Sequence, residues 1–303
     1  MTELRRFTAL VNPIGGDHDA VEAWTPVALA LDAAGAEVST VLTRDAAHAA
    51  AEARRAAAAG DVVVAVGGDG LVRDLAGGVV AGGLDGAGDG GGALAVVPAG
   101  RGNDLAARLG IPRDPAALTS MLLEGPVRPI DVLDADGVVV PGNVYVGVDS
   151  VATGVINRMR RVPSLLAYRL GGPIALLTWR TATFTLTTDD GTRAVRSHSV
   201  VAANTGAYGH GLTIVPSAEV DDGLIDLLVI EADVVSRLKI ASYLAEARTG
   251  RHVERAGVTV TRTRSVRIAA DRPVPLCADG DEIGSLPVTV TVRPGALPLV
   301  LPA

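Results

Sequence analysis

Three glycine-rich segments of the chain have the composition of phosphate-binding loops. They are residues 12–16 (Asn-Pro-Ile-Gly-Gly), 67–70 (Gly-Gly-Asp-Gly) and 100–104 (Gly-Arg-Gly-Asn-Asp), and each follows a short apolar run typical of a buried strand. Glycine lets the backbone approach a phosphate closely, and the N–H groups that begin the following helix point toward it. Since parallel strands end at one edge of a sheet, the three segments are expected to converge. The pattern predicts a nucleotide site.

Asp69 lies among three of these glycines, where its carboxylate would repel a phosphate unless a cation lay between them. Mg²⁺ is the expected cation, because it keeps several waters and takes few carboxylates from the protein. The alternative is that Asp69 only caps the helix that begins near Leu71.

A second acidic site is expected near the end of the chain, where Asp279, Asp281 and Glu282 crowd around Gly280. Mutual repulsion raises the pKa of clustered carboxyl groups, which would keep one of them ready to accept a proton. The alternative is a polar hairpin turn between expected strands at residues 274–277 and 287–292.

Composition excludes several functional classes. The 303 residues include 48% hydrophobic ones, enough for about two domains with sizeable cores. The net charge of −7, without a basic tract, disfavours binding to nucleic acid. Lys239 is the only lysine and fits neither a P-loop nor a protein kinase, and Cys277 is the only cysteine, which leaves no disulfide or thiolate cluster.

The elements expected to position these residues divide the chain in two. Strands alternate with helices through residue 125, which predicts an α/β fold with a doubly wound, Rossmann-like sheet over residues 1–128. Short β-type runs separated by Asp-Gly turns then predict an antiparallel β-sandwich over residues 129–295, interrupted by helices around 150–179 and 234–249. Whether residues 296–303 return to the first domain is left open.

Two apolar stretches in the second domain, residues 165–168 and 174–177, are predicted to be core rather than an acyl-chain tunnel. No stretch has the form of a signal peptide or a membrane span, so we expect a cytoplasmic protein. His210 lies in a loop expected at the surface.

The ordered motifs resemble those of the diacylglycerol kinase catalytic-domain family, which includes bacterial lipid kinases and sphingosine kinases. Beside the three glycine-rich segments, residues 204–211, 216–224 and 278–281 look like later blocks of that family. The resemblance implies an ATP-binding first domain, a β-sandwich second domain, and Mg²⁺-dependent phosphorylation of a lipid hydroxyl in the cleft between them. The substrate it implies most simply is diacylglycerol, converted to phosphatidic acid.

The resemblance also implies roles for individual residues. The ATP-binding residues would be Asn12, Thr43, Gly67, Gly68, Asp69, Gly70, Gly100, Arg101, Gly102 and Asn103. Asp69 would act with Mg²⁺, and Asp281 stands where the family has its glutamate general base, with Glu282 as the next candidate. A separate structural Mg²⁺ would be held by Glu219, Asp222 and Leu224. Bacterial relatives imply a homodimer, and the lipid implies transient, peripheral contact with the inner face of the membrane.

Leu71 and Arg101 replace two threonines of the family's loops. The guanidinium of Arg101 could bind a phosphate bidentately or point to solvent, and the sequence favours neither alternative over the other. The chain could therefore also be a nucleotide- or lipid-binding protein with impaired catalysis. An NAD kinase-like or phosphofructokinase-like enzyme is the remaining alternative, because those folds also use a Gly-Gly-Asp-Gly loop.

Overall fold

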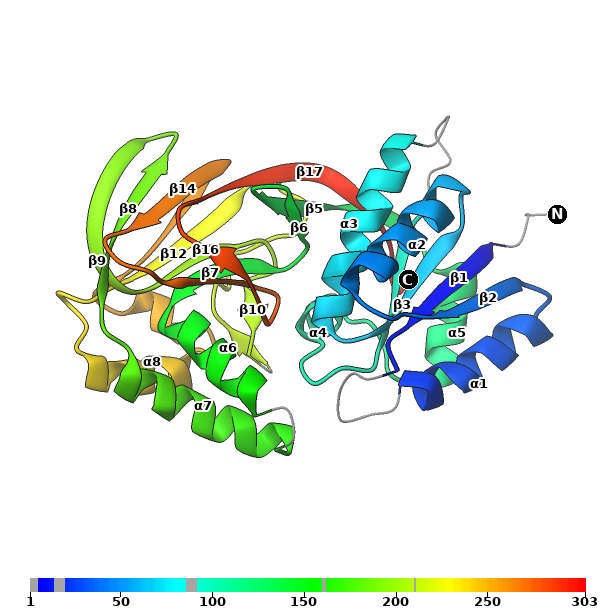
Figure 1. The fold of residues 1–303 in the computed structure, drawn as a ribbon, viewed down its shortest axis with the longest axis horizontal. Coiled ribbons are helices and arrows are strands. Elements are labelled where there is room, and N and C mark those ends of the chain that lie inside the picture. The colour runs from blue at the N-terminus through cyan, green and yellow to red at the C-terminus, as the bar shows by residue number, and fades with distance from the viewer. Residues whose placement is uncertain (1–4, 14–19, 86–91, 160–161, 210) are drawn as a thin grey trace. The chain divides into compact units, whose positions relative to one another are not determined.

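The computed structural model describes residues 5–13, 20–85, 92–159, 162–209 and 211–303. The chain forms two compact units, Met1–Ile130 with Gly295–Ala303 and Asp131–Pro294. It passes from the first unit to the second within β5 (Val127–Ala135) and returns within β17 (Val288–Val300) (Figure 1). The C-terminal residues are thus part of the first unit.

The first unit contains a parallel sheet. Its strands are β1 (Arg6–Val11), β2 (Glu37–Leu42), β3 (Val62–Gly67) and β4 (Leu94–Pro98). They lie in the order β2-β1-β3-β4, and the end of β17 joins β4 in parallel by pairing Leu299 with Leu94. All six residues of β3 are buried, as expected for a strand covered on both faces. The predicted doubly wound α/β domain is confirmed.

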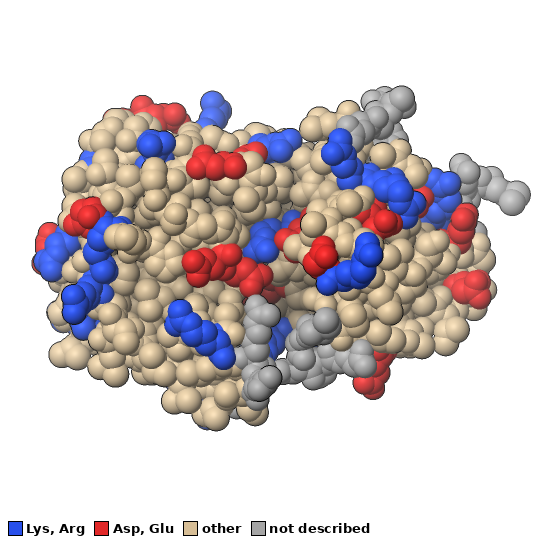
Figure 2. All heavy atoms as spheres, in the orientation of Figure 1, with Lys and Arg blue, Asp and Glu red and all other residues tan. Residues whose placement is uncertain are grey.

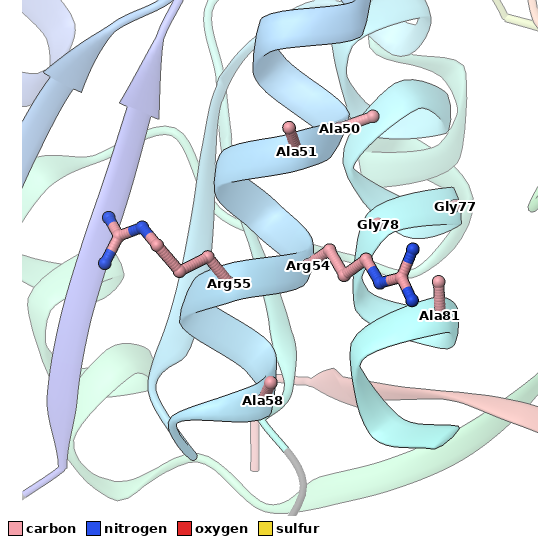
Figure 3. A pocket seen from close by; sticks show the side chains of 8 residues that line it. All are labelled: Ala50, Ala51, Arg54, Arg55, Ala58, Gly77, Gly78 and Ala81. Carbon is pink, nitrogen blue, oxygen red and sulfur yellow. The ribbon is translucent and has the colours of Figure 1, made fainter. Parts of the chain in front are cut away.

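Helices cover both faces of this sheet (Figure 1). They are α1 (Ala20–Ala33), α2 (Ala46–Ala58), α3 (Asp69–Asp85), α4 (Asp104–Arg108) and α5 (Pro115–Glu124). The α2 and α3 backbones nearly touch, since a Cβ on Gly78 would lie 2.5 Å from the Ala50 oxygen. Beside this contact lies a groove of about 520 Å³, lined by alanines, glycines, Arg54 and Arg55 (Figure 3). None of the predicted site residues lines it.

The second unit is a β-sandwich, as predicted. Its strands are β6 (Val138–Val140), β7 (Asn143–Gly147), β8 (Ala182–Thr188), β9 (Gly191–Ala203), β10 (Ala207–Tyr208), β11 (Leu212–Thr213), β12 (Ile225–Glu231), β13 (Val258–Thr263), β14 (Ser265–Ala270), β15 (Pro275–Ala278) and β16 (Asp281–Ser285). The central strand β9 is antiparallel to β7, β8 and β12. Successive residues of β9 point to opposite faces of the sheet and therefore enter two different cores. Val200 and Ala202 pack in one core, and Val201 and Ala203 pack in the other.

Helices α6 (Val148–Arg158), α7 (Ser164–Thr178) and α8 (Arg237–Glu246), with the 3₁₀ turn η1 (Arg251–Glu254), complete this unit. One core expectation is wrong in part: within the stretches 165–168 and 174–177, Leu166 and Leu177 are exposed. These leucines lie on a different side of α7 from its buried residues Ala167 and Ala175. The sequence pattern therefore predicted an apolar helix, but it did not predict which side the rest of the protein covers.

The acidic turn near the end of the chain is tighter than predicted. Strands β15 and β16 pair directly with each other, so the partner of β15 is not residues 287–292. Asp279 and Gly280 connect them with positive φ angles of 46° and 86°. Asp-Gly is a favoured pair for a two-residue hairpin turn that needs positive φ at both positions. Asp281 is therefore the first residue of a strand.

Candidate functional site

Two of the three glycine-rich segments lie together at the carboxyl edge of the parallel sheet. The Ala99 N–H donates to the Gly67 oxygen at 3.0 Å, which joins the ends of β3 and β4. A Cβ on Gly100 would lie only 2.2 Å from the Gly68 Cα. The two loops therefore approach at a distance that only glycine at position 100 permits.

The first segment is described only at its beginning. The N–H of Asn12 donates to the Val66 oxygen at 3.2 Å, so Asn12 lies at the same edge of the sheet. Thr43 follows β2, and its buried side chain donates to the Val11 oxygen at 3.2 Å. Residues 14–16, which include the two glycines of this segment, lie outside the described residues.

Asn103 shapes the third segment. Its backbone is left-handed, with φ 57° and ψ 42°, and its side chain is buried. Its Oδ1 accepts from the Gly100 N–H at 2.8 Å, and its Nδ2 donates to the Gly100 oxygen at 2.7 Å. These reciprocal bonds close the loop just before α4. Asn103 therefore holds the backbone in place rather than presenting its own amide.

Asp69, the first residue of α3, reaches across to the start of α4. Its Oδ1 accepts from the Leu105 N–H at 3.3 Å. Burial raises the pKa of Asp69 to about 6, the nearby Asp104 carboxylate adds to the rise, and the backbone N–H groups of residues 103–105 oppose it. A Cβ on Gly102 would lie 2.9 Å from the Asp69 Oδ2 and 3.2 Å from the Asp104 Oδ2. Gly102 thus leaves open a space that two carboxylates face, and this oxygen donor set fits Mg²⁺.

The two residues that replace family threonines differ in their surroundings. Leu71 is buried, and its Cδ2 lies 2.8 Å from where a Cβ on Gly67 would be. The Leu71 side chain therefore packs over the end of β3, and only its backbone is available to a ligand. Arg101 is half-buried within the third segment.

In the second unit, the turn before β16 separates the three clustered acids. The carboxylate of Asp279 accepts from the N–H groups of Gly142 at 3.1 Å and Asn143 at 2.8 Å. These two hydrogen bonds occupy the Asp279 carboxylate and fix the turn to the start of β7. Asp281 is half-buried and Glu282 is exposed, which leaves these two carboxylates as candidates for proton transfer.

A small cavity in this unit has apolar walls and one polar end. Its volume is about 20 Å³, and Leu228 of β12 with Ile240 and Leu244 of α8 are among its lining residues. The polar end contains Asp149, Ser199 and Tyr208. Both the Ser199 and the Tyr208 hydroxyls donate hydrogen bonds to the Asp149 carboxylate, whose pKa is raised by burial.

A chain of contacts joins this cavity to the turn that carries Asp281. The Tyr208 ring stacks on Tyr145, with centroids 4.8 Å apart and planes 13° apart. The Tyr145 hydroxyl bonds to the Thr153 hydroxyl at 2.9 Å and accepts from the Gly280 N–H. On the other side, the Asn157 amide donates to the Gly280 oxygen at 2.9 Å.

Sequence reasoning missed Asp149, Ser199 and Tyr208. Asp149 could have been found, because it follows the end of a buried strand, β7, as Asp69 follows β3. Nothing in the sequence joins it to Ser199 and Tyr208, which are about fifty residues away. His210 lies outside the described residues.

The three residues expected to hold a structural Mg²⁺ fit that ion only in part. Asp222 and Leu224 are adjacent, since the Leu224 N–H donates to the Asp222 Oδ1 at 3.0 Å, whereas Glu219 is exposed. The Asp222 Oδ2 is buried without a hydrogen bond, but Arg262 Nη2 lies 3.6 Å from it. Arg262 Nε also lies 3.5 Å from Asp226. The Arg262 guanidinium therefore already offsets the negative charge of the Asp222 and Asp226 carboxylates. In the described part of the chain, no three His, Cys, Asp or Glu side chains gather as a metal site.

Comparison with known proteins covers both units. Residues 6–135 match the diacylglycerol kinase catalytic domain, and residues 142–301 match the YegS C-terminal NAD kinase beta sandwich-like domain. A diacylglycerol kinase of Mycobacterium tuberculosis is 32% identical over 99% of this chain and 96% of its own length. One of Bacillus subtilis is 27% identical over 94% and 92%.

A crystal structure of a diacylglycerol kinase from Bacillus anthracis has the same fold. Its TM-score is 0.73, with 19% sequence identity, over 99% of this chain and 98% of that one. At that identity the likeness concerns the fold alone. Within the described residues, no helix is long and apolar enough to cross a membrane.

Proposed function

The chain belongs to the diacylglycerol kinase catalytic-domain family of lipid kinases, and from that premise we propose that it transfers the γ-phosphate of ATP to a lipid hydroxyl. Diacylglycerol is the proposed acceptor, which would yield phosphatidic acid. The observation that supports a lipid acceptor is that 99% of this chain, both units included, aligns with a diacylglycerol kinase at 32% identity.

The nucleotide is proposed to bind the glycine-rich loops of the first unit. The touching backbones of Gly68 and Gly100 form a surface without side chains. Backbone N–H groups there can donate to phosphate oxygens, except that of Gly100, which is bonded to Asn103. Asp69 and Asp104 would hold Mg²⁺ at the space left open by Gly102. When bound, Mg²⁺ neutralises phosphate charge and draws these two carboxylates into their ionised forms.

The acceptor hydroxyl is proposed to lose its proton to Asp281. The carboxylate accepts that proton as the lipid oxygen forms its bond to the γ-phosphorus and the bond to the leaving ADP oxygen breaks. Asp279 cannot serve, because its oxygens accept two backbone N–H groups. The Asp279 anchor and the Asn157 contact fix the turn, and thus hold the first residue of β16 in place.

The experiment measures radiolabelled phosphate transfer from ATP to dispersed lipid alcohols, with NAD and a sugar phosphate as the competing acceptors. Asp281→Asn is expected to lower the rate by about 10²–10⁴-fold, the usual cost of losing a general base. Glu282→Gln is the matched control, because it removes the neighbouring carboxylate, and it should leave the rate within about threefold. If the two variants exchanged these results, Glu282 would be the base.

One observation keeps an impaired enzyme as a second candidate. Leu71 offers no hydroxyl to the nucleotide. ATP binding without transfer to any acceptor would favour this candidate, whereas transfer to NAD or to the sugar phosphate would replace the lipid by a small-molecule acceptor.

A further inference from the structure

The hairpin turn before Asp281 is exposed, yet side chains from other elements hold both main-chain groups of Gly280. The Gly280 N–H donates to the Tyr145 hydroxyl, and the Gly280 oxygen accepts from the Asn157 amide at 2.9 Å. Gly280 itself is exposed. Because water can satisfy the peptide groups of an exposed turn, burial of those groups does not explain why the protein supplies partners for them.

Packing does little to fix the strand that follows this turn. β16 lies at the end of the strand order, beside β15, and none of its five residues is buried. A Cβ on Gly280 would meet no atom of the described chain within 4 Å. Figure 2 shows acidic side chains at the surface over β16. A short edge strand with so little burial is held weakly, so the direction of the Asp281 side chain depends on the hydrogen bonds of the turn.

Tyr145 is a rigid support for the turn. It lies within β7, where it pairs with Cys277 of β15 on one side and with Val201 of β9 on the other. Its ring is buried and stacks on the Tyr208 ring, with centroids 4.8 Å apart. A hydrogen bond from Gly280 to this hydroxyl therefore ties an exposed turn to the centre of the sheet.

Thr153 of α6 sets the direction of the Tyr145 hydroxyl. The two hydroxyl oxygens lie 2.9 Å apart. Since the Tyr145 oxygen accepts from the Gly280 N–H, its own proton is directed to Thr153. Burial raises the pKa of Tyr145 well above its ordinary value, so the hydroxyl keeps this proton at neutral pH. Thr153 and Asn157 are one helical turn apart, so the same side of α6 supports both groups of Gly280.

We propose that Tyr145 is a positioning residue for phosphate transfer, and that Thr153 assists it by orienting its hydroxyl. Tyr145 would hold the turn so that the Asp281 carboxylate points at the acceptor hydroxyl as the proton is removed. A displacement of about 1 Å near the reacting atoms can cost about 10²-fold in rate. The inference rests on the proposed function in taking Asp281 as the general base.

The first test compares Tyr145→Phe with the wild type by radiolabelled phosphate transfer from ATP to dispersed diacylglycerol. Phenylalanine keeps the stacked ring and removes only the hydroxyl. We expect kcat to fall by about 10- to 10²-fold, while the KM values for ATP and for the acceptor stay within about twofold. Thr153→Val should lower kcat by about three- to tenfold, and Thr153→Ser, which restores a hydroxyl, should return kcat to the wild-type value.

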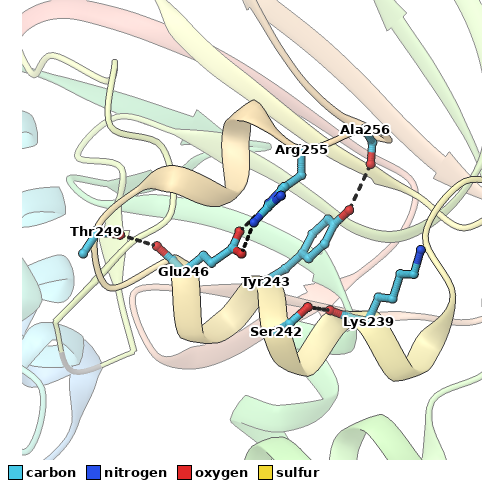
Figure 4. Close-up of polar contacts among 7 residues, drawn as sticks. All are labelled: Lys239, Ser242, Tyr243, Glu246, Thr249, Arg255 and Ala256. Carbon is cyan, nitrogen blue, oxygen red and sulfur yellow. Dashed lines mark hydrogen bonds and ion pairs between the residues drawn. The ribbon is translucent and has the colours of Figure 1, made fainter.

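Two control variants near the end of α8 remove hydroxyl groups of the same kinds (Figure 4). The Tyr243 hydroxyl donates to the Ala256 oxygen at 3.1 Å, and the Thr249 hydroxyl donates to the Glu246 oxygen at 3.0 Å. Tyr243→Phe should lower the melting temperature about as much as Tyr145→Phe does, but it and Thr249→Val should keep the wild-type kcat. If Tyr243→Phe lowers kcat as much as Tyr145→Phe, the loss reflects stability alone and the proposal fails.

A double-mutant cycle shows whether Tyr145 acts through Asp281. Adding Tyr145→Phe to Asp281→Asn should leave the rate of Asp281→Asn unchanged, because a base that is absent cannot be misplaced. A double variant whose loss is the product of the two single losses would overturn the proposal, since Tyr145 would then act by another route.

Hydrogen exchange examines the turn without an assay of activity. The Gly280 amide should exchange about two- to tenfold faster in Tyr145→Phe than in the wild type, which is the range that one hydrogen bond contributes. In Tyr243→Phe it should exchange at the wild-type rate. Unchanged exchange in Tyr145→Phe would show that the hydroxyl does not hold the turn, and would overturn the proposal.

The same variants separate this proposal from the proposed function. If Asp281→Asn is slow while Tyr145→Phe transfers phosphate at the wild-type rate, the general base stands and the positioning role fails. If Tyr145→Phe is slow and loses protection at Gly280 while Asp281→Asn is as fast as the wild type, Tyr145 does position the turn, and the proposed function has the wrong base.

Discussion

Replacing Asp69 by asparagine should stabilise the first unit and abolish its use of Mg²⁺. Asp69 has its pKa raised to about 6 from an ordinary value of 3.8, first by burial and then by the Asp104 charge. The native state therefore holds this proton in a pH range where the unfolded chain has lost it. Stability consequently falls as pH rises from 3.8 to about 6, and the full cost of the ionised carboxylate is present above that range.

The magnitude follows from the same pKa difference. A rise from 3.8 to about 6 corresponds to a cost of about 3 kcal/mol at pH 8 and about half of that at pH 5. The value at pH 8 is a ceiling, since the side chain is partly open to solvent. Asparagine keeps an oxygen that can accept the Leu105 N–H but carries no charge. Asp69→Asn should therefore gain up to about 3 kcal/mol at pH 8 and roughly half as much at pH 5.

Urea unfolding measures this gain. The chain has two tryptophans, and in a Trp179→Phe background the fluorescence reports Trp24, which is buried in the first unit. Asp114→Asn is the control, because Asp114 caps α5 through the Ala117 N–H and asparagine caps equally well. Calorimetry of ATP binding with and without Mg²⁺ supplies the second result, in which Asp69→Asn should lose the Mg²⁺-dependent part. A destabilised variant, or a gain that does not change with pH, would show that Asp69 is only a helix cap.

Further predictions concern the loops and Arg262. Gly100→Ala should lower the free energy of unfolding by about 1–3 kcal/mol and remove ATP binding, because its Cβ would lie 2.2 Å from the Gly68 Cα. Gly83→Ala on α3 is the control, since a Cβ there would have no atom within 4 Å, and it should raise the free energy of unfolding by up to about 1 kcal/mol in the same denaturation series. Arg101→Thr should weaken ATP binding by calorimetry if its guanidinium meets a phosphate, and Leu71→Thr should change the affinity little or strengthen it; tighter binding by Arg101→Thr would mean that the arginine obstructs the site. Arg262→Ala should lower the melting temperature, because Asp222 and Asp226 lose a cation at 3.6 and 3.5 Å. Added Mg²⁺ should restore part of that loss if Asp222 is a cation ligand, and Na⁺ at equal ionic strength should not.

Much of the fold was predictable because its determinants are local. The β-branched run of β3 predicted a strand buried on both faces, and the structure buries all six of its residues. A hairpin turn near Gly280 was the alternative to an acidic site, and the structure does turn there, with positive φ at Asp279 and Gly280. The expected partner of β15 was nevertheless wrong. A turn signal marks where the chain reverses, but strand pairing depends on which backbone donors and acceptors remain available nearby.

The candidate site shows the same division. Glycines at the ends of β3 and β4 indicated by themselves that backbones approach a ligand or each other. Only the tertiary structure showed that Asp279 is occupied by backbone N–H groups of residues 142 and 143, which leaves Asp281 and Glu282. Three acids in sequence look alike, because what distinguishes them is a hydrogen-bond partner more than 130 residues away.

By itself, the sequence determined the parallel sheet with its glycine loops, the sandwich with its turns, and the family to which the chain belongs. These follow from backbone preferences and from periodicities that act over a few residues. The tertiary structure alone decided that Asp149, Ser199 and Tyr208 meet at one end of a cavity, and that the leucines of α7 face outward. Periodicity shows that a helix side is apolar, but what covers that side depends on which distant segments pack there. The sequence therefore marked the residues able to do chemistry, and only the fold decided which of them act together.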